Sequence, residues 1–270
     1  MPHYEEITLV REGRVALLTL NRPQKLNALT PRMLWHEIPP ALREVETDPE
    51  VGALVITGAG KGFSSGADVS GLNRSIGTDV STADPAFTSP EPWGMRYAFI
   101  ERLRNLPKPT IAAVNGVAAG AGLSIALACD LRIAGPTARF CSVFIRRGLV
   151  PDCGATFFLS RLLGTAKALE MMYTGDIIEA PEAERLGLVN QVVPAEELLG
   201  TALALASRMA KGPPVALALT KRIVYHWLER DLLAQLEYEA YNQRLCRETE
   251  DFKEGVRAFL EKREPEFKGR

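Results

Sequence analysis

Apolar positions in the first two thirds of the chain form short runs that are separated by turn residues and by segments of helical period. Short β-prone runs bounded by turns are typical of strands. The expected strands are Ile7–Val10, Val15–Leu20, Val51–Thr57, Thr110–Val114, Leu131–Ala134 and Asn190–Val193. The first two form a hairpin around Arg11–Arg14. Val51–Thr57 is apolar throughout, as strands covered on both faces are.

Helical patterns fill most of the spaces between these strands, which predicts an α/β core. One helical segment follows Thr30-Pro31, an N-cap pattern, and extends to Val45 with a kink or restart at Pro39-Pro40. The other helical segments are Met95–Leu106, the residues after Gly116–Gly122 as far as Ala128, Leu162–Met172 and Ala180–Leu186. Leu72–Gly94 has no clear period and predicts a long loop.

From Glu196 onward the pattern is helical only. The expected helices are Glu196–Lys211, Val215–Leu228, Asp231–Cys246 and Asp251–Lys262. We therefore divide the chain into an α/β core, residues 1–195, and a C-terminal helical region, residues 196–270. Helices that leave a core this late often pack on a neighbouring chain, so we expect an oligomer.

Composition narrows the classes of function. The chain has 270 residues, a net charge of -1 and 46% hydrophobic residues, so a large core is expected, with no basic field for nucleic acid or a membrane surface. The four cysteines have no CxxC spacing and the three histidines no HxxxH or HExxH pattern, so no metal site is expected. The N-terminus lacks the pattern of a signal peptide, and no apolar run reaches membrane-spanning length, which indicates a cytoplasmic protein.

Two glycine-rich stretches follow predicted strands. Gly62–Leu72 (GFSSGADVSGL) lets the backbone approach a ligand closely, although an ordinary turn between a strand and a helix has the same composition. Asn115–Asp130 leads from a strand into an apolar helix, which places free amides at a helix N-terminus or serves only close packing. If both turns open into one pocket, two amides could bind one oxygen, as in an oxyanion hole.

Asp152 stands alone in a third stretch, RRGLVPDCGAT, just ahead of a helix-like segment. One interpretation is an N-cap, since aspartate accepts hydrogen bonds from the amides of a first helical turn. The other is a catalytic acid or base among Val150, Phe157 and Phe158. The local pattern leaves both interpretations open.

In this order, the stretches resemble the crotonase superfamily, also called the enoyl-CoA hydratase/isomerase family. The segments that carry the resemblance are NRPQKLNAL (Asn21–Leu29), SGAD (Ser65–Asp68), Lys108–Ala134, Gly148–Gly164, Thr174–Val193 and the terminal FKEGVRAFLEKREPEF. The resemblance implies a ClpP/crotonase-like spiral of ββα units whose C-terminal helices form homotrimers, often doubled to hexamers. It also implies an acyl-coenzyme A thioester as the substrate, and no separate cofactor.

The resemblance assigns an oxyanion hole to the backbone amides of Ala67 and Ala121, which would stabilise an enolate. It further implies that the coenzyme A lies along Lys25 and Leu26 and that a phosphate meets a basic residue, here Lys262. The residues that it places around the adenine are Ala67, Asp68 and Val69.

The chain departs from the family pattern at two positions. Hydratases of this family use two glutamates to activate water, and these positions hold Ser124 and Phe144 here. Asp152 matches the carboxylate of members that resemble 1,2-epoxyphenylacetyl-CoA isomerases and some enoyl-CoA isomerases. We therefore expect an isomerase with Asp152 as its single acid/base. The alternatives are a hydratase-like or hydrolytic enzyme for a bulkier acyl group, and a non-catalytic acyl-CoA binder.

Several aromatic residues are candidates for the acyl pocket. Trp93 in the long loop, together with Phe144 and Phe157, would shape a pocket for an aromatic or long-chain acyl group, next to Ser124. The same aromatic residues could instead belong to the hydrophobic core.

Overall fold

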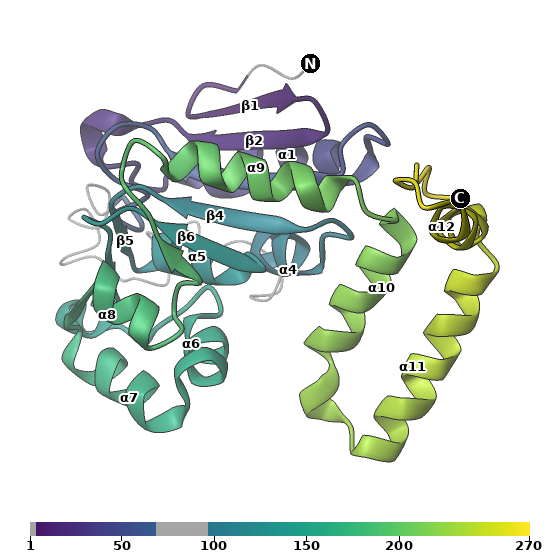
Figure 1. The fold of residues 1–270 in the computed structure, drawn as a ribbon. Coiled ribbons are helices and arrows are strands. Elements are labelled where there is room, and N and C mark those ends of the chain that lie inside the picture. The colour runs from purple at the N-terminus through teal and green to yellow at the C-terminus, as the bar shows by residue number, and fades with distance from the viewer. Residues whose placement is uncertain (1–3, 69–96) are drawn as a thin grey trace.

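The computed structural model describes residues 4–68 and 97–270, and a six-stranded sheet forms its centre (Figure 1). The order along the sheet is β1 (Ile7–Glu12), β2 (Val15–Leu20), β3 (Ala53–Gly58), β4 (Thr110–Val114), β6 (Leu131–Ala134) and β9 (Gln191–Val192). β1 and β2 pair in antiparallel fashion, whereas the remaining neighbours are parallel. All six strands expected from the sequence are confirmed.

A second sheet was not predicted. It contains β5 (Val117–Ala119), β7 (Arg139–Cys141) and β8 (Ile177–Glu179). β5 pairs with β7 in parallel, and β7 pairs with β8 in antiparallel fashion. Each strand has three residues, too few for a period of two to stand out in the sequence.

The main sheet is apolar because both of its faces are covered. Along β3, Leu54 and Ile56 enter one hydrophobic cluster, and Ala53 and Val55 enter another on the opposite face. The first cluster is completed by α1 (Ile38–Thr47), α4 (Ala98–Asn105) and α5 (Ala121–Ala128), and the second by α9 (Leu198–Ala210). Each buried leucine or isoleucine contributes about 1.5–3 kcal/mol to folding.

Pro39-Pro40 and Gly164 lie where one helix ends and the next begins. A π-helix, η2 (Arg32–Glu37), gives way to α1 beside Pro39-Pro40, so the expected restart is confirmed. Prolines fit there because the first amides of a helix need no acceptor. The helix expected over Leu162–Met172 is instead two helices, α6 (Ala155–Leu163) and α7 (Thr165–Thr174), since Gly164 between them has φ of +73°. α8 (Ala180–Arg185) follows as expected.

The C-terminal helices differ in how closely they contact the sheet. α9 packs on the sheet through Ala202, Ala206 and Ala210, because these small side chains let the helix lie close to β3 and β4. The helices that extend away from the core are α10 (Pro214–Tyr225), α11 (Leu232–Arg247) and α12 (Glu250–Glu261) (Figure 1). Within the described ranges, no helix combines the length and the apolar character needed to cross a membrane.

A buried polar cluster fastens α10 to the core. Asp130 accepts hydrogen bonds from the amide of Thr110 at 2.8 Å and from the Tyr225 hydroxyl, and its carboxylate lies 3.0 Å from Lys221 Nζ. The Arg104 guanidinium stacks on the Tyr225 ring at 3.7 Å. Burial lowers the pKa of Lys221 and raises that of Tyr225. Asp130 therefore joins the sheet to the first of the projecting helices.

Candidate active site

The candidate site is built around the turn that follows β3. Asn27 is fully buried, and its side-chain amide donates to the carbonyls of Ala59 at 2.9 Å and Gly62 at 2.7 Å. The Ser64 hydroxyl donates in return to the Asn27 carbonyl at 2.9 Å. The early NRPQKLNAL stretch and the SGAD stretch, far apart in sequence, therefore form one rigid unit.

The same turn runs parallel to β5. Ser64 and Ala118 form a parallel β-bridge. The Ser64 amide donates to the Val117 carbonyl, and the Ala119 amide donates to the Ser64 carbonyl, both at 2.9 Å. A Cβ placed on Gly66, the residue before Ala67, would lie 3.6 Å from the Ala121 amide nitrogen, so the turn adjoins the start of α5. Gly66 has φ of +93°, and a Cβ there would lie 2.8 Å from the Ala119 carbonyl oxygen. Only glycine permits this close approach.

The amides of Ala67 and Ala121 have no hydrogen-bond acceptor among residues 4–68 and 97–270 and are the candidate donors of this turn. In the β-bridge between Leu29 and Ala67, the Leu29 amide donates to the Gly66 carbonyl at 2.8 Å and the Asp68 amide donates to the Leu29 carbonyl at 2.9 Å. Within the described residues, this pattern leaves the Ala67 amide without a hydrogen-bond partner. Ala121 is the first residue of α5, where amides have no intrahelical acceptor. The helix dipole adds partial positive charge at this end. An oxyanion hole requires two such donors directed at one oxygen.

Asp152 does not cap a helix. α6 begins at Ala155, its N-cap is Gly154, and no side chain accepts from its first turn. Cys153 and Gly154 both have positive φ, +50° and +79°, so the chain turns sharply between Asp152 and the helix. The N-cap interpretation is therefore wrong, because the turn removes the carboxylate from the amides that it would have capped.

The carboxylate of Asp152 is partly engaged. The Tyr97 hydroxyl donates to Oδ2 at 3.3 Å, whereas Oδ1 is buried and has no hydrogen-bond partner among residues 4–68 and 97–270. Burial raises the pKa of the neighbouring Cys153 thiol, and the carboxylate raises it further. The thiol therefore stays protonated near neutral pH.

Ser124 and Phe144 lie between Asp152 and the oxyanion turn. Ser124 is fully buried on α5, and its hydroxyl lies 3.2 Å from the Asp152 carbonyl and 3.4 Å from the Gly120 carbonyl. Phe144, in the 3-10 helix η5 (Val143–Arg147), is 8% exposed, and its ring lies 3.8 Å from where a Cβ on Gly120 would stand. The structure brings Ala121, Ser124, Phe144 and Asp152 together.

Two of the residues predicted along the coenzyme A flank the glycine-rich turn. Lys25 and Leu26 are exposed, and their carbonyls accept from the hydroxyl and the amide of Ser65 at 3.3 and 2.9 Å. Asp68 is adjacent, and its carboxylate forms an ion pair with Arg22 at 2.9 Å. Its side chain therefore supports the turn.

Phe157 and Lys262 are the other predicted site residues that the structure describes. Phe157 lies on the outer side of α6, where Arg161 and Arg104 stack on its ring at 3.4 and 4.8 Å. Lys262 ends α12, which lies beyond α10 and away from α5 and α6 of the same chain (Figure 1). Val69 and Trp93 lie outside the described residues.

Tyr97 was missed by the sequence interpretation. It immediately precedes α4, 55 positions before the aspartate that it contacts. A lone tyrosine ahead of a helix carries no signal of its partner, because the pairing depends on how α4 and α5 pack on the sheet.

Comparison with known proteins agrees with this geometry. The family model described as enoyl-CoA hydratase/isomerase matches residues 11–270. The chain is 39% identical to the 1,2-epoxyphenylacetyl-CoA isomerase of Escherichia coli over 264 residues, with 96% of this chain and 97% of the relative covered. It is also 39% identical to the short-chain-enoyl-CoA hydratase of Clostridium acetobutylicum over 271 residues, with 98% of each covered.

Solved structures show the same fold. An enoyl-CoA hydratase from Polaromonas superposes with a TM-score of 0.88 at 36% identity, over 97% of this chain and 99% of that one. The fold is therefore the crotonase fold that the resemblance implied. With the family model and full-length relatives in agreement, the chain belongs to the enoyl-CoA hydratase/isomerase family of acyl-CoA enzymes.

Proposed function

We propose that this enzyme isomerises an enoyl-CoA or a ring-epoxide acyl-CoA, with Asp152 as its single acid/base. The observation that carries the proposal is the position of Asp152, which the Ser124 hydroxyl connects to Gly120 of the oxyanion turn. The positions of the two hydratase glutamates hold Ser124 and Phe144. The identity to the E. coli 1,2-epoxyphenylacetyl-CoA isomerase supports the same reaction class.

The reaction on an enoyl substrate needs one proton to move. The thioester oxygen accepts hydrogen bonds from the Ala67 and Ala121 amides, which lowers the energy of the enolate. Asp152 removes a proton from C2 of a 3-enoyl thioester and returns it at C4, so the double bond moves into conjugation with the carbonyl. Phe144 keeps water from the position that a second carboxylate would occupy in a hydratase.

The test is Asp152→Asn, which preserves the size of the side chain and removes its basicity. Turnover of a 3-enoyl-CoA should fall by about 10²–10⁴, the usual contribution of a general base. Binding of the substrate should change little, because the oxyanion amides belong to the backbone. Turnover close to that of the parent enzyme would refute the role of Asp152.

A second candidate is hydration, which the names of relatives favour. The C. acetobutylicum relative is called a short-chain-enoyl-CoA hydratase, and a 38% identical protein of Syntrophomonas wolfei is called a crotonyl-CoA hydratase. The unpartnered Oδ1 of Asp152 could hold a water for this reaction. Incubation with crotonyl-CoA in ¹⁸O-water separates the two, since an isomerase incorporates no label.

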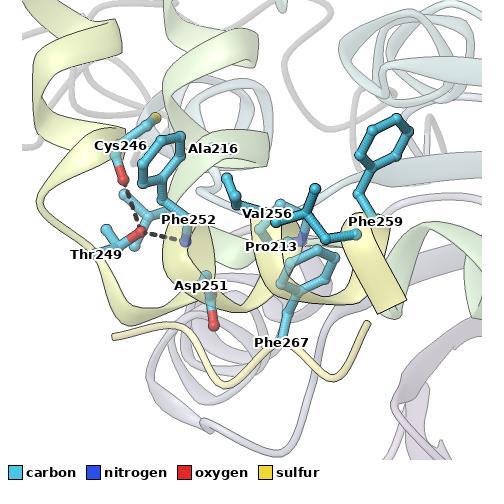
Figure 2. Close-up of a pocket in the computed structure, with 12 residues that line it drawn as sticks. Pro213, Ala216, Cys246, Thr249, Asp251, Phe252, Val256, Phe259 and Phe267 are labelled. Atoms are coloured by element: carbon cyan, nitrogen blue, oxygen red, sulfur yellow. Dashed lines mark hydrogen bonds between the residues drawn. The ribbon is translucent and has the colours of Figure 1, made fainter. Parts of the chain in front are cut away.

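We also propose that the enzyme assembles as a trimer or a dimer of trimers through α10–α12. Four side chains of these helices are 68–81% exposed: Leu232, Leu233, Phe259 and Leu260. A groove of about 400 Å³ between α10, α12 and the C-terminal tail adds further apolar surface, including Phe252 and Phe267 (Figure 2). The groove joins the exposed Phe259 and Leu260 in one apolar patch, of the kind that marks protein–protein contact sites, which supports a second copy of the chain as its partner.

A further inference from the structure

The contact between Tyr97 and Asp152 has no role in the reaction as described so far. Tyr97 is half-buried immediately before α4, and its hydroxyl donates to Asp152 Oδ2 at 3.3 Å. The other oxygen, Oδ1, is buried and has no partner within the described ranges. The two oxygens of one carboxylate therefore differ: one is held by a phenol, and one is left for another group.

We propose that Tyr97 is a positioning residue that fixes the Asp152 carboxylate with Oδ1 directed at the reacting carbon of the substrate. This inference rests on the proposed function, because it assumes that Asp152 exchanges the proton. It adds a residue from a different element to the catalytic apparatus.

Asp152 is held at both of its ends. The Ser124 hydroxyl, from α5, holds its main-chain carbonyl at 3.2 Å, and the Tyr97 hydroxyl, ahead of α4, holds its side chain. α4 and α5 pack against each other in one hydrophobic cluster, so the two anchors keep a constant separation. The terminal torsion of an aspartate rotates easily, and a hydrogen bond to one oxygen limits that rotation. Misplacement of a reacting group by 1 Å costs roughly 10²-fold in rate.

A hydroxyl that donates to a carboxylate interacts more strongly with the anion than with the neutral acid. Cys153, the titratable neighbour on the same turn, stays protonated because burial raises its pKa. Ser124, the neighbour from α5, does not titrate. The proposed role therefore predicts that the acidic limb of a pH–rate profile moves when the Tyr97 hydroxyl is removed or altered.

The experiment compares Tyr97→Phe with the parent enzyme on a 3-enoyl-CoA over a range of pH. We expect kcat to fall by about tenfold to a hundredfold, the equivalent of one hydrogen bond to a charged group, with KM within about twofold. The acidic limb should move to higher pH. Tyr173→Phe is the matched control: Tyr173 is 70% exposed on α7, and its loss of a hydroxyl should leave kcat and the pH profile unchanged.

A second substitution protects the test from a folding defect. Incorporation of 3-fluorotyrosine at position 97 keeps the volume and makes the hydroxyl a stronger donor, so the acidic limb should move to lower pH. The proposal would be overturned if Tyr97→Phe had the same kcat and the same acidic limb as the parent enzyme. The proposal would also be overturned if both variants lost activity and melted at a lower temperature than the parent enzyme while their acidic limbs did not move.

The two proposals fail in different ways. If Asp152→Asn keeps its turnover, the proposed function is wrong whatever Tyr97→Phe does. If Asp152→Asn is inactive and Tyr97→Phe behaves as the parent enzyme, only the positioning role is wrong.

Discussion

Half-buried carboxylates differ in what their oxygens contact. Asp68 pairs with Arg22, and Asp130 accepts from Thr110, Lys221 and Tyr225. These partners connect neighbouring elements, so both carboxylates serve the structure. Asp152 keeps a buried oxygen without a partner in the described part of the chain. This difference in partners, and not the residue type, marks Asp152 for chemistry.

Gly66 gives the sharpest prediction for a single residue of the oxyanion hole. In Gly66→Ala the new Cβ meets the Ala119 carbonyl oxygen at 2.8 Å, and φ of +93° is strained for alanine. The turn must move, and the Ala67 amide moves with it. Turnover should fall by about 10²–10³, the usual cost of one oxyanion donor, as measured by steady-state kinetics on the best thioester.

Gly13→Ala is the control for backbone strain. Gly13 has φ of +60° in the β1–β2 turn, and a Cβ at this position would meet no atom within 4 Å. The variant should lose about 1–3 kcal/mol of stability from the strained conformation and keep its turnover. If Gly66→Ala loses no more activity than Gly13→Ala, the oxyanion assignment on this turn is wrong.

At the scale of elements, α5 supplies two parts of the candidate site. Ala121 begins the helix, so its amide is free of intrahelical bonds, and Ser124 follows one turn later on the same side. The hydroxyl of Ser124 reaches the turn before α6 at 3.2 Å. The short apolar helix therefore sets the separation between the Ala121 amide and the turn that carries Asp152.

The connection between η2 and β1 depends on Glu37, whose carboxylate accepts from the amides of Glu5, Glu6 and Ile7 at 3.0–3.1 Å. Burial raises its pKa, but these amides and the Arg32 guanidinium lower it more, so the pKa lies below its ordinary value. A depressed carboxyl pKa stabilises the fold above the unfolded pKa, and the effect disappears as pH falls through the folded pKa. Glu37 should therefore stabilise the fold at neutral pH.

Glu37→Gln should lower the free energy of unfolding at neutral pH by about 1–3 kcal/mol, the contribution of hydrogen bonds to a charged group. Urea unfolding at decreasing pH should show the difference from the parent protein narrowing as the native carboxyl becomes protonated. Glu182→Gln is the control, because its exposed pair with Arg185 on α8 contributes little. A difference that persists unchanged into acid would contradict the role of the charge.

The whole molecule consists of a covered sheet and three projecting helices. α9 completes the core, whereas α10–α12 contact it through a few anchors such as Asp130 with Lys221 (Figure 1). α12 carries Phe259, which is 81% exposed beside the groove of Figure 2. A helix of such amphipathic character is stable when its apolar side finds a partner.

Phe259→Glu tests the proposed assembly. A charge at this position should be excluded from an apolar interface, so the variant should dissociate towards monomers in sedimentation equilibrium. Lys253→Ala, an exposed polar position on the same helix, should keep the assembly of the parent protein. A parent enzyme that is monomeric at micromolar concentration would refute the proposal outright.

The sequence by itself determined the strands of the main sheet, the C-terminal helices and the family. Apolar strands buried on both faces and long helical patterns are local features that need no partner to be recognised. The glycine-rich turns and the order of the motifs also identified Ala67, Ala121 and Asp152 as candidates.

Only the tertiary structure decided which candidates meet. It formed the three-residue strands of the second sheet, placed α9 on the core and stacked Arg161 on the ring of Phe157. It also showed that Asp152 caps no helix and contacts Tyr97. These outcomes depend on long-range packing and on two positive φ angles, Cys153 and Gly154, which no periodicity in the sequence encodes.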